Sequence, residues 1–374
     1  MHSESRNNKY TIYMNEPFIV VHIGAGFHSP QKTAQYKALL KQTCNETMAK
    51  LRKGVSAEDA VVHAISNLEN SDLTNAGFGS NLNYCGQVEC DAAIMSGRDC
   101  SFGSVGSVRA RNAIVGAKAV MDLDRKGEIG SGRIAPMTLV GSGAESFLRE
   151  IGIEVIENDD LISFDARNKW KKWRSVVDRK EEVKNGDNEL PGKRVKFNDQ
   201  TSDLVNDTVG AIAFDKDGFL CSGVSSGGIA LKIPGRISEA CIYGAGCWAS
   251  KNVACSVSGT GEQIVKTAFA RSIEMILDND NEENSDGIDS LAFVKCLEDF
   301  VASPRLAKYA DKSVGFISTR VSRTDKGNSY CECFVGHTTE SMGVGYMGGK
   351  DKEPRAMISR KAPGKVHSVF MTNI

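Results

Sequence analysis

Strand-like and helix-like segments occur in blocks along this chain of 374 residues. Short apolar runs bounded by turn-forming residues predict strands over residues 18–21, 88–95, 209–214, 219–225, 314–321, 330–335 and 343–347. Apolar residues at helical spacing predict helices over residues 36–51, 56–68, 263–277 and 290–301. Parallel βαβ units would alternate regularly, so these blocks predict an α+β fold in which helices and sheets form separate layers.

Two polar stretches interrupt this pattern. Residues 165–196 contain eleven Lys or Arg residues and six acidic ones, and this basic stretch is expected to be mobile, although the sequence does not decide whether it is helical or disordered. Residues 278–289 contain six acidic residues and no basic one, which predicts a solvated loop. The formal net charge of the whole chain is only −1, so direct binding to nucleic acid is not expected.

Composition also bears on localisation and cofactors. The apolar run at residues 18–23 is too short for a signal peptide or a membrane span, so we expect a soluble, intracellular protein. The eleven cysteines are odd in number and include no Cys-x-x-Cys pair, which indicates neither a disulfide framework nor a zinc site. We expect them to be small buried residues in a reducing compartment, and we expect no metal or organic cofactor.

The bond between Asp207 and Thr208 could generate a nucleophile that carries its own base. If this bond is cut, Thr208 gains a free α-amine, which is one of the few groups that can activate a threonine hydroxyl. A lone Asp-Thr pair is rarely a processing site. Here the basic stretch leads into it, a strand of small residues follows it, and glycines at 24, 26, 227, 228, 259 and 261 are expected around the same site.

Several motifs resemble those of the type 2 asparaginases, which are N-terminal-nucleophile hydrolases. These motifs are His-Ile-Gly-Ala-Gly at 22–26, Thr-Asn-Ala-Gly-Phe-Gly-Ser-Asn-Leu-Asn at 74–83, Glu-Cys-Asp-Ala at 89–92, Ser-Ser-Gly-Gly at 225–228, Pro-Gly-Arg at 234–236, Gly-Ala-Gly-Cys-Trp at 244–248, Ser-Gly-Thr-Gly-Glu at 258–262 and Ser-Met-Gly-Val-Gly-Tyr-Met at 341–347. Within the family the chain is most similar to the threonine aspartases (taspases), because of the long segment before Thr208, the Cys247–Trp248 pair and residues 337–342.

This resemblance implies one domain over residues 1–374 with a four-layer αββα sandwich. Members of the family are made as inactive precursors that cut themselves before the threonine. The cut would give an α subunit of residues 1–207, with the basic mobile insert at about 160–207, and a β subunit of residues 208–374. The family also implies that two such αβ units pair into a dimer.

The resemblance assigns the reacting groups. Thr208 would attack the Asp207 carbonyl in the precursor and later attack substrates, with its freed α-amine as base. Ser258 and the backbone N–H of Gly259 align with the donors that stabilise the oxyanion. Ser226 aligns with a second hydroxyl that contacts the nucleophile, although a serine at such a glycine-rich hairpin end is otherwise an ordinary turn residue.

Other matched positions would bind substrate. Arg236 would grip the carboxylate of an Asp side chain bidentately, since a guanidinium suits that geometry. Asn75 and Gly24 match positions that line the site, and Lys32 matches a lysine of taspases. Glu239 stands where asparaginases place an acidic residue that holds the free α-amine of the substrate; taspases generally have a neutral residue there.

These features predict a self-processing threonine endopeptidase that cleaves proteins after Asp, often within Asp-Gly. The resemblance implies nuclear substrates, such as trithorax-type chromatin regulators and the large-subunit precursor of transcription factor IIA. Residues 191–197 resemble a short nuclear localisation signal, which would engage the import machinery and place the protein in nucleus and cytoplasm. Two alternatives stay open: an asparaginase or isoaspartyl dipeptidase on the same scaffold, and a catalytically idle relative that uses the basic insert as a binding arm.

Overall fold

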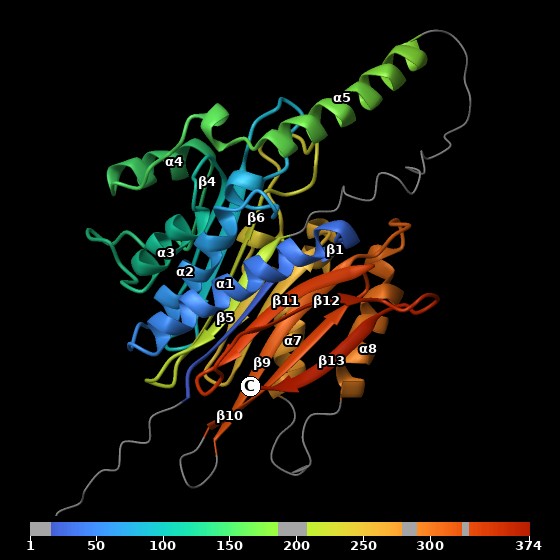
Figure 1. Ribbon diagram of the computed structural model, residues 1–374. Helices are drawn as coiled ribbons and strands as arrows, with labels where there is room; N and C mark the ends of the chain where they lie inside the picture. Colours follow the sequence, from blue (N-terminus) through green and yellow to red (C-terminus); the bar gives the residue numbers. More distant parts are fainter. Residues whose placement is uncertain (1–15, 186–207, 279–289, 324–328) are drawn as a thin grey trace, which may run out of the picture.

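Two β-sheets face each other at the centre of the molecule, and helices cover their outer faces (Figure 1). The computed structural model describes residues 16–185, 208–278, 290–323 and 329–374. The larger sheet has eight strands in the order β12-β11-β1-β5-β6-β2-β3-β4, and the smaller has five in the order β13-β10-β9-β8-β7. The predicted four-layer αββα sandwich is therefore confirmed.

The strands of the large sheet are β1 (Phe18–Gly26), β2 (Cys90–Ser96), β3 (Phe102–Val108), β4 (Thr138–Val140), β5 (Val209–Phe214), β6 (Leu220–Ser226), β11 (Ser341–Gly348) and β12 (Arg355–Arg360). Those of the small sheet are β7 (Cys247–Ala249), β8 (Val253–Gly259), β9 (Val314–Arg323), β10 (Ser329–His337) and β13 (Ser368–Asn373). The helices are α1 (Thr33–Leu51), α2 (Ala57–Glu69), α3 (Ala113–Asp124), α4 (Gly141–Glu150), α5 (Phe164–Asn185), α6 (Gly261–Thr267), α7 (Phe269–Asp278) and α8 (Ser290–Ala302). Helices α1 to α4 pack on the large sheet, and α7 and α8 pack on the small one.

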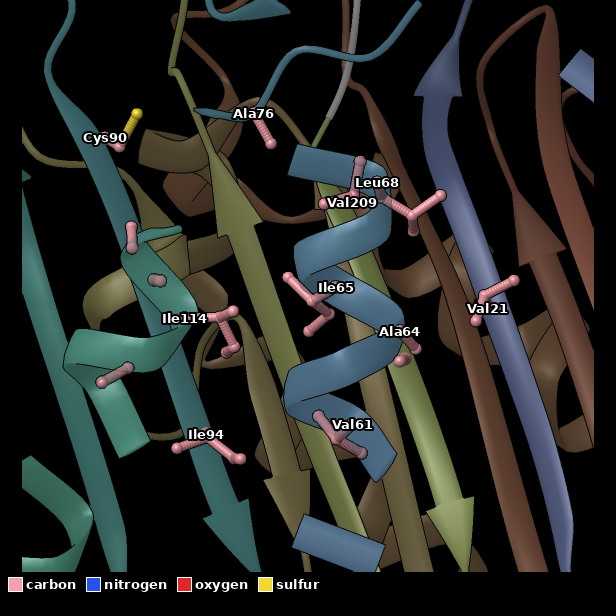
Figure 2. Close-up of a cluster of buried hydrophobic side chains, with 14 of the residues drawn as sticks. Val21, Val61, Ala64, Ile65, Leu68, Ala76, Cys90, Ile94, Ile114 and Val209 are labelled. Carbon is pink, nitrogen blue, oxygen red and sulfur yellow. The ribbon is translucent and has the colours of Figure 1, made fainter. Parts of the chain in front are cut away.

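Helix α2 shows how local sequence places a helix on the large sheet. The side chain of Ser56 caps it by accepting a hydrogen bond from the backbone N–H of Asp59 at 3.1 Å. Val61, Ile65 and Leu68 follow at helical spacing and are fully buried. Figure 2 shows this stripe lying over the strands, so burial of one helix face joins the first and second layers.

Strand β1 is buried on both faces. Ile19 and Val21 point to the cluster beneath α1 and α2, whereas Phe18 and Val20 point to the cluster between the two sheets. The ring of Phe18 stacks on that of Phe214 with centroids 5.4 Å apart. Burial on both faces explains why this strand is a continuous apolar run, where a strand with one solvated face would alternate.

A third cluster fills the space between the small sheet and its helices. Phe269 of α7 and Phe293 of α8 pack against Phe316 of β9, and Phe293 also lies 4.5 Å from Phe334 of β10, measured between ring centroids. Aromatic side chains bury large apolar areas, so these contacts fix both helices on the outer face of the sheet.

Strands from before and after residue 208 are neighbours in the large sheet. Strand β1 lies between β11 and β5, and β2 pairs with β6. Gly210 of β5 lies opposite His22 of β1. A Cβ atom at Gly210 would collide with the side chains of His22 and Ser256, so only glycine allows the two strands and the second sheet to approach this closely.

One predicted helix is two helices. The sequence predicts a continuous helix over residues 263–277. In the structure the helix is interrupted at Ala268, whose φ of 47° is left-handed. Alanine rarely adopts this conformation, so no local signal marks the break. The break matters for the arrangement, because α6 packs beside residues 239–241 whereas α7 packs on β8.

The first part of the basic stretch is helical, where the sequence had suggested mobility. Residues 164–185 form helix α5, which extends away from the layers in Figure 1. The indole N–H of Trp170 donates to the Asn83 carbonyl at 2.9 Å, and the Arg174 guanidinium lies 3.8 Å from the ring centre of Tyr84. These contacts explain the helix, together with the absence of Gly and Pro from residues 164–185. The rest of the insert, at 186–207, lies outside the described residues, as does the acidic stretch at 279–289.

The cysteines are free, and most are buried, with Cys85 and Cys100 exposed. Among the described helices, none combines the length and the apolar character needed to cross a bilayer.

Candidate active site

Thr208 lies immediately before β5 and is almost completely buried, with 2% of its surface exposed. Its Oγ1 is 3.0 Å from Oγ of Ser226, at the end of β6, and 2.9 Å from Oε1 of Glu239. The predicted nucleophile is therefore in contact with two other predicted site residues. Asp207, on the other side of the bond predicted to be cut, lies outside the described residues.

His22 on the neighbouring strand fixes the backbone of Thr208. The ring is fully buried, it forms a hydrogen bond with the Thr208 backbone, and its Nε2 lies 2.9 Å from Oγ of Ser256. Burial lowers the pKa of His22 to about 3, so the ring is neutral near pH 7. A neutral ring that holds the backbone serves to position Thr208.

A cavity of about 180 Å³ opens at Thr208. It is lined by Asn75, Asn81, Thr208, Ser226, Gly228, Ile229, Ala230, Arg236, Ser238, Glu239, Gly259, Thr260 and Gly261. Six of the residues predicted for the site are therefore brought together, although they come from distant parts of the chain. In the part of the chain that the structure describes, no group of three or more His, Cys, Asp or Glu side chains is arranged to hold a metal ion.

The turn after β6 forms one wall of this cavity. The backbone N–H of Gly228 donates to Oγ of Ser226 at 3.0 Å, and the side-chain amide of Asn75 donates to the Gly228 carbonyl at 2.9 Å. A Cβ atom on Gly227 would lie only 2.6 Å from Oδ1 of Asn75. Glycine at 227 thus lets Asn75 approach the turn and hold Ser226 against Thr208.

Arg236 forms a second wall and is held by Glu262. Its Nε and Nη2 donate to the two carboxylate oxygens of Glu262 at 2.8 and 2.7 Å. This pair occupies the edge of the guanidinium formed by Nε and Nη2, so the bidentate grip on a substrate carboxylate that the sequence predicts is not made through that edge while Glu262 stays paired. The remaining nitrogen, Nη1, is buried and has no acceptor among the described residues. It is available to a carboxylate in the cavity.

The segment that carries Arg236 and Glu239 is anchored by Asp91 of β2. The buried carboxylate accepts from the Ser238 backbone N–H at 2.7 Å and from the Ser107 backbone N–H at 2.8 Å. Asp91 was part of a family motif, but no role had been assigned to it. A carboxylate that accepts two backbone hydrogen bonds fixes the segment without facing the nucleophile.

Glu239 is the ionisable group in contact with the nucleophile. It is 1% exposed, and this burial raises its pKa to about 7; the hydrogen bond with Thr208 and the charge of Arg236 act in the opposite direction. Its Oε2 faces the first residue of α6, since a Cβ atom on Gly261 would lie 2.6 Å away from that oxygen. The carboxyl group of Glu239 therefore titrates much closer to neutral pH than an exposed glutamate does.

The predicted oxyanion donors lie at the end of β8. Gly259 lines the cavity with a φ of 138°, and a Cβ atom there would collide with the Ser313 carbonyl, so glycine is required. Ser258 is fully buried next to it but does not line the cavity. Its Oγ accepts from the Ala25 backbone N–H at 3.0 Å, which ties β8 to β1.

Two other predicted residues lie outside the cavity lining. Gly24 sits at an irregularity in the pairing of β1 with β11, and its N–H turns back to Nδ1 of His22 at 3.3 Å. Lys32 precedes α1, and its ammonium group forms an ion pair with Asp165 of α5 at 3.4 Å on the surface. The structure thus gives Lys32 a contact with the insert, and its contact with substrate stays a prediction.

We expect Glu262→Gln to raise KM for an acidic substrate by about tenfold with a smaller change in kcat. Burial acts to raise the pKa of Glu262, but Arg236 lowers it below the usual range, so Glu262 is anionic and holds the guanidinium in place. Steady-state kinetics would measure the effect. Glu332→Gln is the matched control, since Glu332 also accepts from Nε and Nη2 of a largely buried arginine, Arg320, although through Oε2 alone and within the small sheet. A lower KM would mean that Glu262 competes with the substrate.

Comparison with known proteins places this site in a family. A model of the asparaginase family (Asparaginase_2) matches residues 15–293, so the C-terminal motif at 341–347 lies outside the match. An isoaspartyl peptidase/L-asparaginase of Danio rerio is 32% identical over 257 residues, which cover 68% of this chain and 74% of that protein. A plant-type L-asparaginase of Pyrobaculum calidifontis is 34% identical over 256 residues, covering 67% of this chain and 77% of that protein.

An isoaspartyl peptidase/L-asparaginase of Mus musculus gives a similar result, with 32% identity over 258 residues that cover 68% of this chain and 70% of that protein. The matched region includes Thr208 and every residue that lines the cavity. The layered fold agrees with the match. The chain therefore belongs to the asparaginase family (Asparaginase_2) of N-terminal-nucleophile hydrolases.

Proposed function

We propose that this protein is a self-cleaving threonine endopeptidase that acts on peptide bonds following Asp. The observation that supports it is the buried Thr208 hydroxyl, which opens into the same cavity as Nη1 of Arg236, a nitrogen with no acceptor in the part of the chain that the structure describes. A nucleophile and a cationic donor in one small cavity suit a substrate with a carboxylate near the bond to be cut.

The proposed reaction begins after the bond before Thr208 has been cut. The free α-amine, with an ordinary pKa of about 7.7–8.0, takes the hydroxyl proton, and Oγ1 attacks the carbonyl carbon of the Asp residue. Arg236 holds the side-chain carboxylate through Nη1, and the Gly259 N–H donates to the oxyanion. The leaving amine departs with a proton, and water hydrolyses the ester on Thr208.

A second candidate is an asparaginase or isoaspartyl dipeptidase. The names of the relatives support this candidate more directly than the first, because those proteins are isoaspartyl peptidases and L-asparaginases. The site supports it less well. A free amino-acid substrate brings an α-ammonium group that needs an anion, and Glu239 is only partly ionised near pH 7 and already contacts Thr208.

We expect the purified protein to contain a fragment whose N-terminus is Thr208 and to cleave a peptide with an internal Asp-Gly bond faster than an isoaspartyl dipeptide. Denaturing electrophoresis with N-terminal sequencing tests maturation, and mass spectrometry of the two substrates compares turnover. Cleavage of the dipeptide alone would establish the second candidate. A chain that stays intact would favour a catalytically idle relative with the basic insert as a binding arm.

The proposal also covers the substrates, the localisation and the assembly of the protein. We propose nuclear transcription regulators as substrates, entry into the nucleus through the basic residues at 191–197, and pairing of two αβ units. The support is the sequence motif and the family resemblance, since residues 191–197 lie outside the described part of the structure.

A further inference from the structure

Before maturation, Thr208 has no free α-amine. Its nitrogen is part of a peptide bond, and an amide nitrogen does not accept a proton near neutral pH. The base that serves the mature site is therefore not available for the first cut. Another group in the uncut chain has to take the proton from the Thr208 hydroxyl if this hydroxyl is to attack.

Two side chains of the described residues contact that hydroxyl. Ser226 is a weak base, and its Oγ already accepts a hydrogen bond from the Gly228 N–H at 3.0 Å. Glu239 is a carboxylate, and its Oε1 lies 2.9 Å from Oγ1 of Thr208. Only the Glu239 carboxylate can take the Thr208 proton, hold it and later return it. The Ser226 hydroxyl could accept this proton only by giving its own proton to a further group.

We propose that Glu239 is the general base of self-cleavage, taking the Thr208 proton through the hydrogen bond between Oε1 and Oγ1. This role rests on the proposed self-cleavage. It differs from the role expected of an acidic residue at this position, which is to hold the α-amine of a substrate. The longer side chain of Glu explains the difference, since it reaches the nucleophile directly.

The steps balance without any further reactant except water. Glu239 takes the hydroxyl proton as Oγ1 of Thr208 bonds to the carbonyl carbon of Asp207. The peptide C–N bond breaks, and Glu239 gives the proton to the departing nitrogen, which becomes the free α-amine. Water then splits the resulting ester: its oxygen joins the carbonyl carbon of Asp207, and one hydrogen returns to Oγ1.

The charges around Glu239 set the pH at which this base is active. Arg236 on the same segment favours the anion, Asp91 of β2 opposes it, and Glu262 of α6 is paired with Arg236. Burial dominates and raises the pKa of Glu239 to about 7. Since the deprotonated form is the active one, self-cleavage accelerates as pH rises through about 7 and is level above it.

We expect Glu239→Gln to slow self-cleavage by about 10²- to 10³-fold at alkaline pH and to abolish the inflection near neutrality. Gln keeps the shape and the hydrogen bond but cannot take a proton. The full chain would be made by cell-free translation, transferred to buffers from about pH 5 to about pH 9, and followed by denaturing electrophoresis over time. Cleavage of Glu239→Gln at the wild-type rate and with the wild-type inflection would overturn the proposal.

Glu69→Gln is the matched control. Glu69 is also fully buried, and burial raises its pKa to about 7, but it contacts Ser225 and the Ile114 backbone. We expect this variant to keep the inflection. Asp207→Asn tests the adjacent carboxylate, and loss of the inflection there but not in Glu239→Gln would assign the base to Asp207.

Two further outcomes keep this proposal separate from the proposed function. If the wild-type chain does not cut itself under any condition, the proposed function fails, whatever Glu239 does. If circular dichroism shows that Glu239→Gln is unfolded, Glu239→Asp replaces it: a shorter carboxylate is expected to cut more slowly but to keep a pH inflection. A Glu239→Asp protein without that inflection would contradict the role as base.

Discussion

Thr208→Val should abolish both self-cleavage and turnover of added substrates, with a fall of about 10⁴- to 10⁶-fold, the range seen when a central catalytic group of a serine protease is removed. Valine has the shape of threonine but lacks the hydroxyl. The position is buried and packed, so the change leaves the fold intact while Ser226 and Glu239 lose their shared partner. Denaturing electrophoresis and a peptide cleavage assay measure the two activities.

Thr208→Ser serves as the control, because it keeps a hydroxyl at the same place. We expect it to retain part of both activities. Thermal unfolding would show that the valine variant is folded. If Thr208→Val still produced the two fragments, the nucleophile would be a different residue, and the proposed mechanism would be wrong at its first step.

Arg236→Ala should lower kcat/KM for an Asp-containing peptide by about 10²-fold, which corresponds to about 3 kcal/mol. The reason is that Nη1 is buried and unpartnered among the described residues, so it contributes a charge-assisted hydrogen bond only when a carboxylate enters. Self-cleavage should slow by less than about tenfold, because the bond to be cut is already held next to Thr208 by the chain. Steady-state kinetics and a time course of maturation separate the two effects.

Arg320→Ala is a matched control for this experiment. Arg320 is also largely buried and also donates through Nε and Nη2 to a glutamate, but it lies on β9 away from the cavity. We expect it to alter stability and leave kcat/KM near the wild-type value. Equal loss of self-cleavage and substrate turnover in Arg236→Ala would show that Arg236 supports the site as a whole and does not select the substrate.

The parts of the fold that local sequence specifies were predictable. The apolar run of β1, the Ser56 cap of α2 and the hairpin of β5 and β6 all follow from short-range patterns. The edge strands β12 and β13 were not predicted, because they are short, partly exposed and defined mainly by pairing with β11 and β10. Their position depends on tertiary contacts that a local pattern does not contain.

In the site, too, some features follow from sequence motifs and others depend on tertiary contacts. Family motifs indicated Thr208, Ser226 and Arg236, and the structure places all three at one cavity. The motifs did not show that Glu262 occupies the fork of Arg236. That contact brings the first turn of α6 against a residue 26 positions earlier in the chain, which a local sequence pattern does not specify. The sequence also gives no sign of the ion pair between Lys32 and Asp165, since this pair depends on where α5 packs against the rest of the protein.

The order of strands in the large sheet has a consequence for the mature protein. A cut before Thr208 would leave β1 in one fragment, with β11 and β5 of the other fragment hydrogen-bonded to its two edges. The two fragments would then be interleaved, and neither could leave without breaking the backbone ladders of the central sheet. The two fragments would therefore stay together after the cut, because their dissociation would require unfolding of the central sheet.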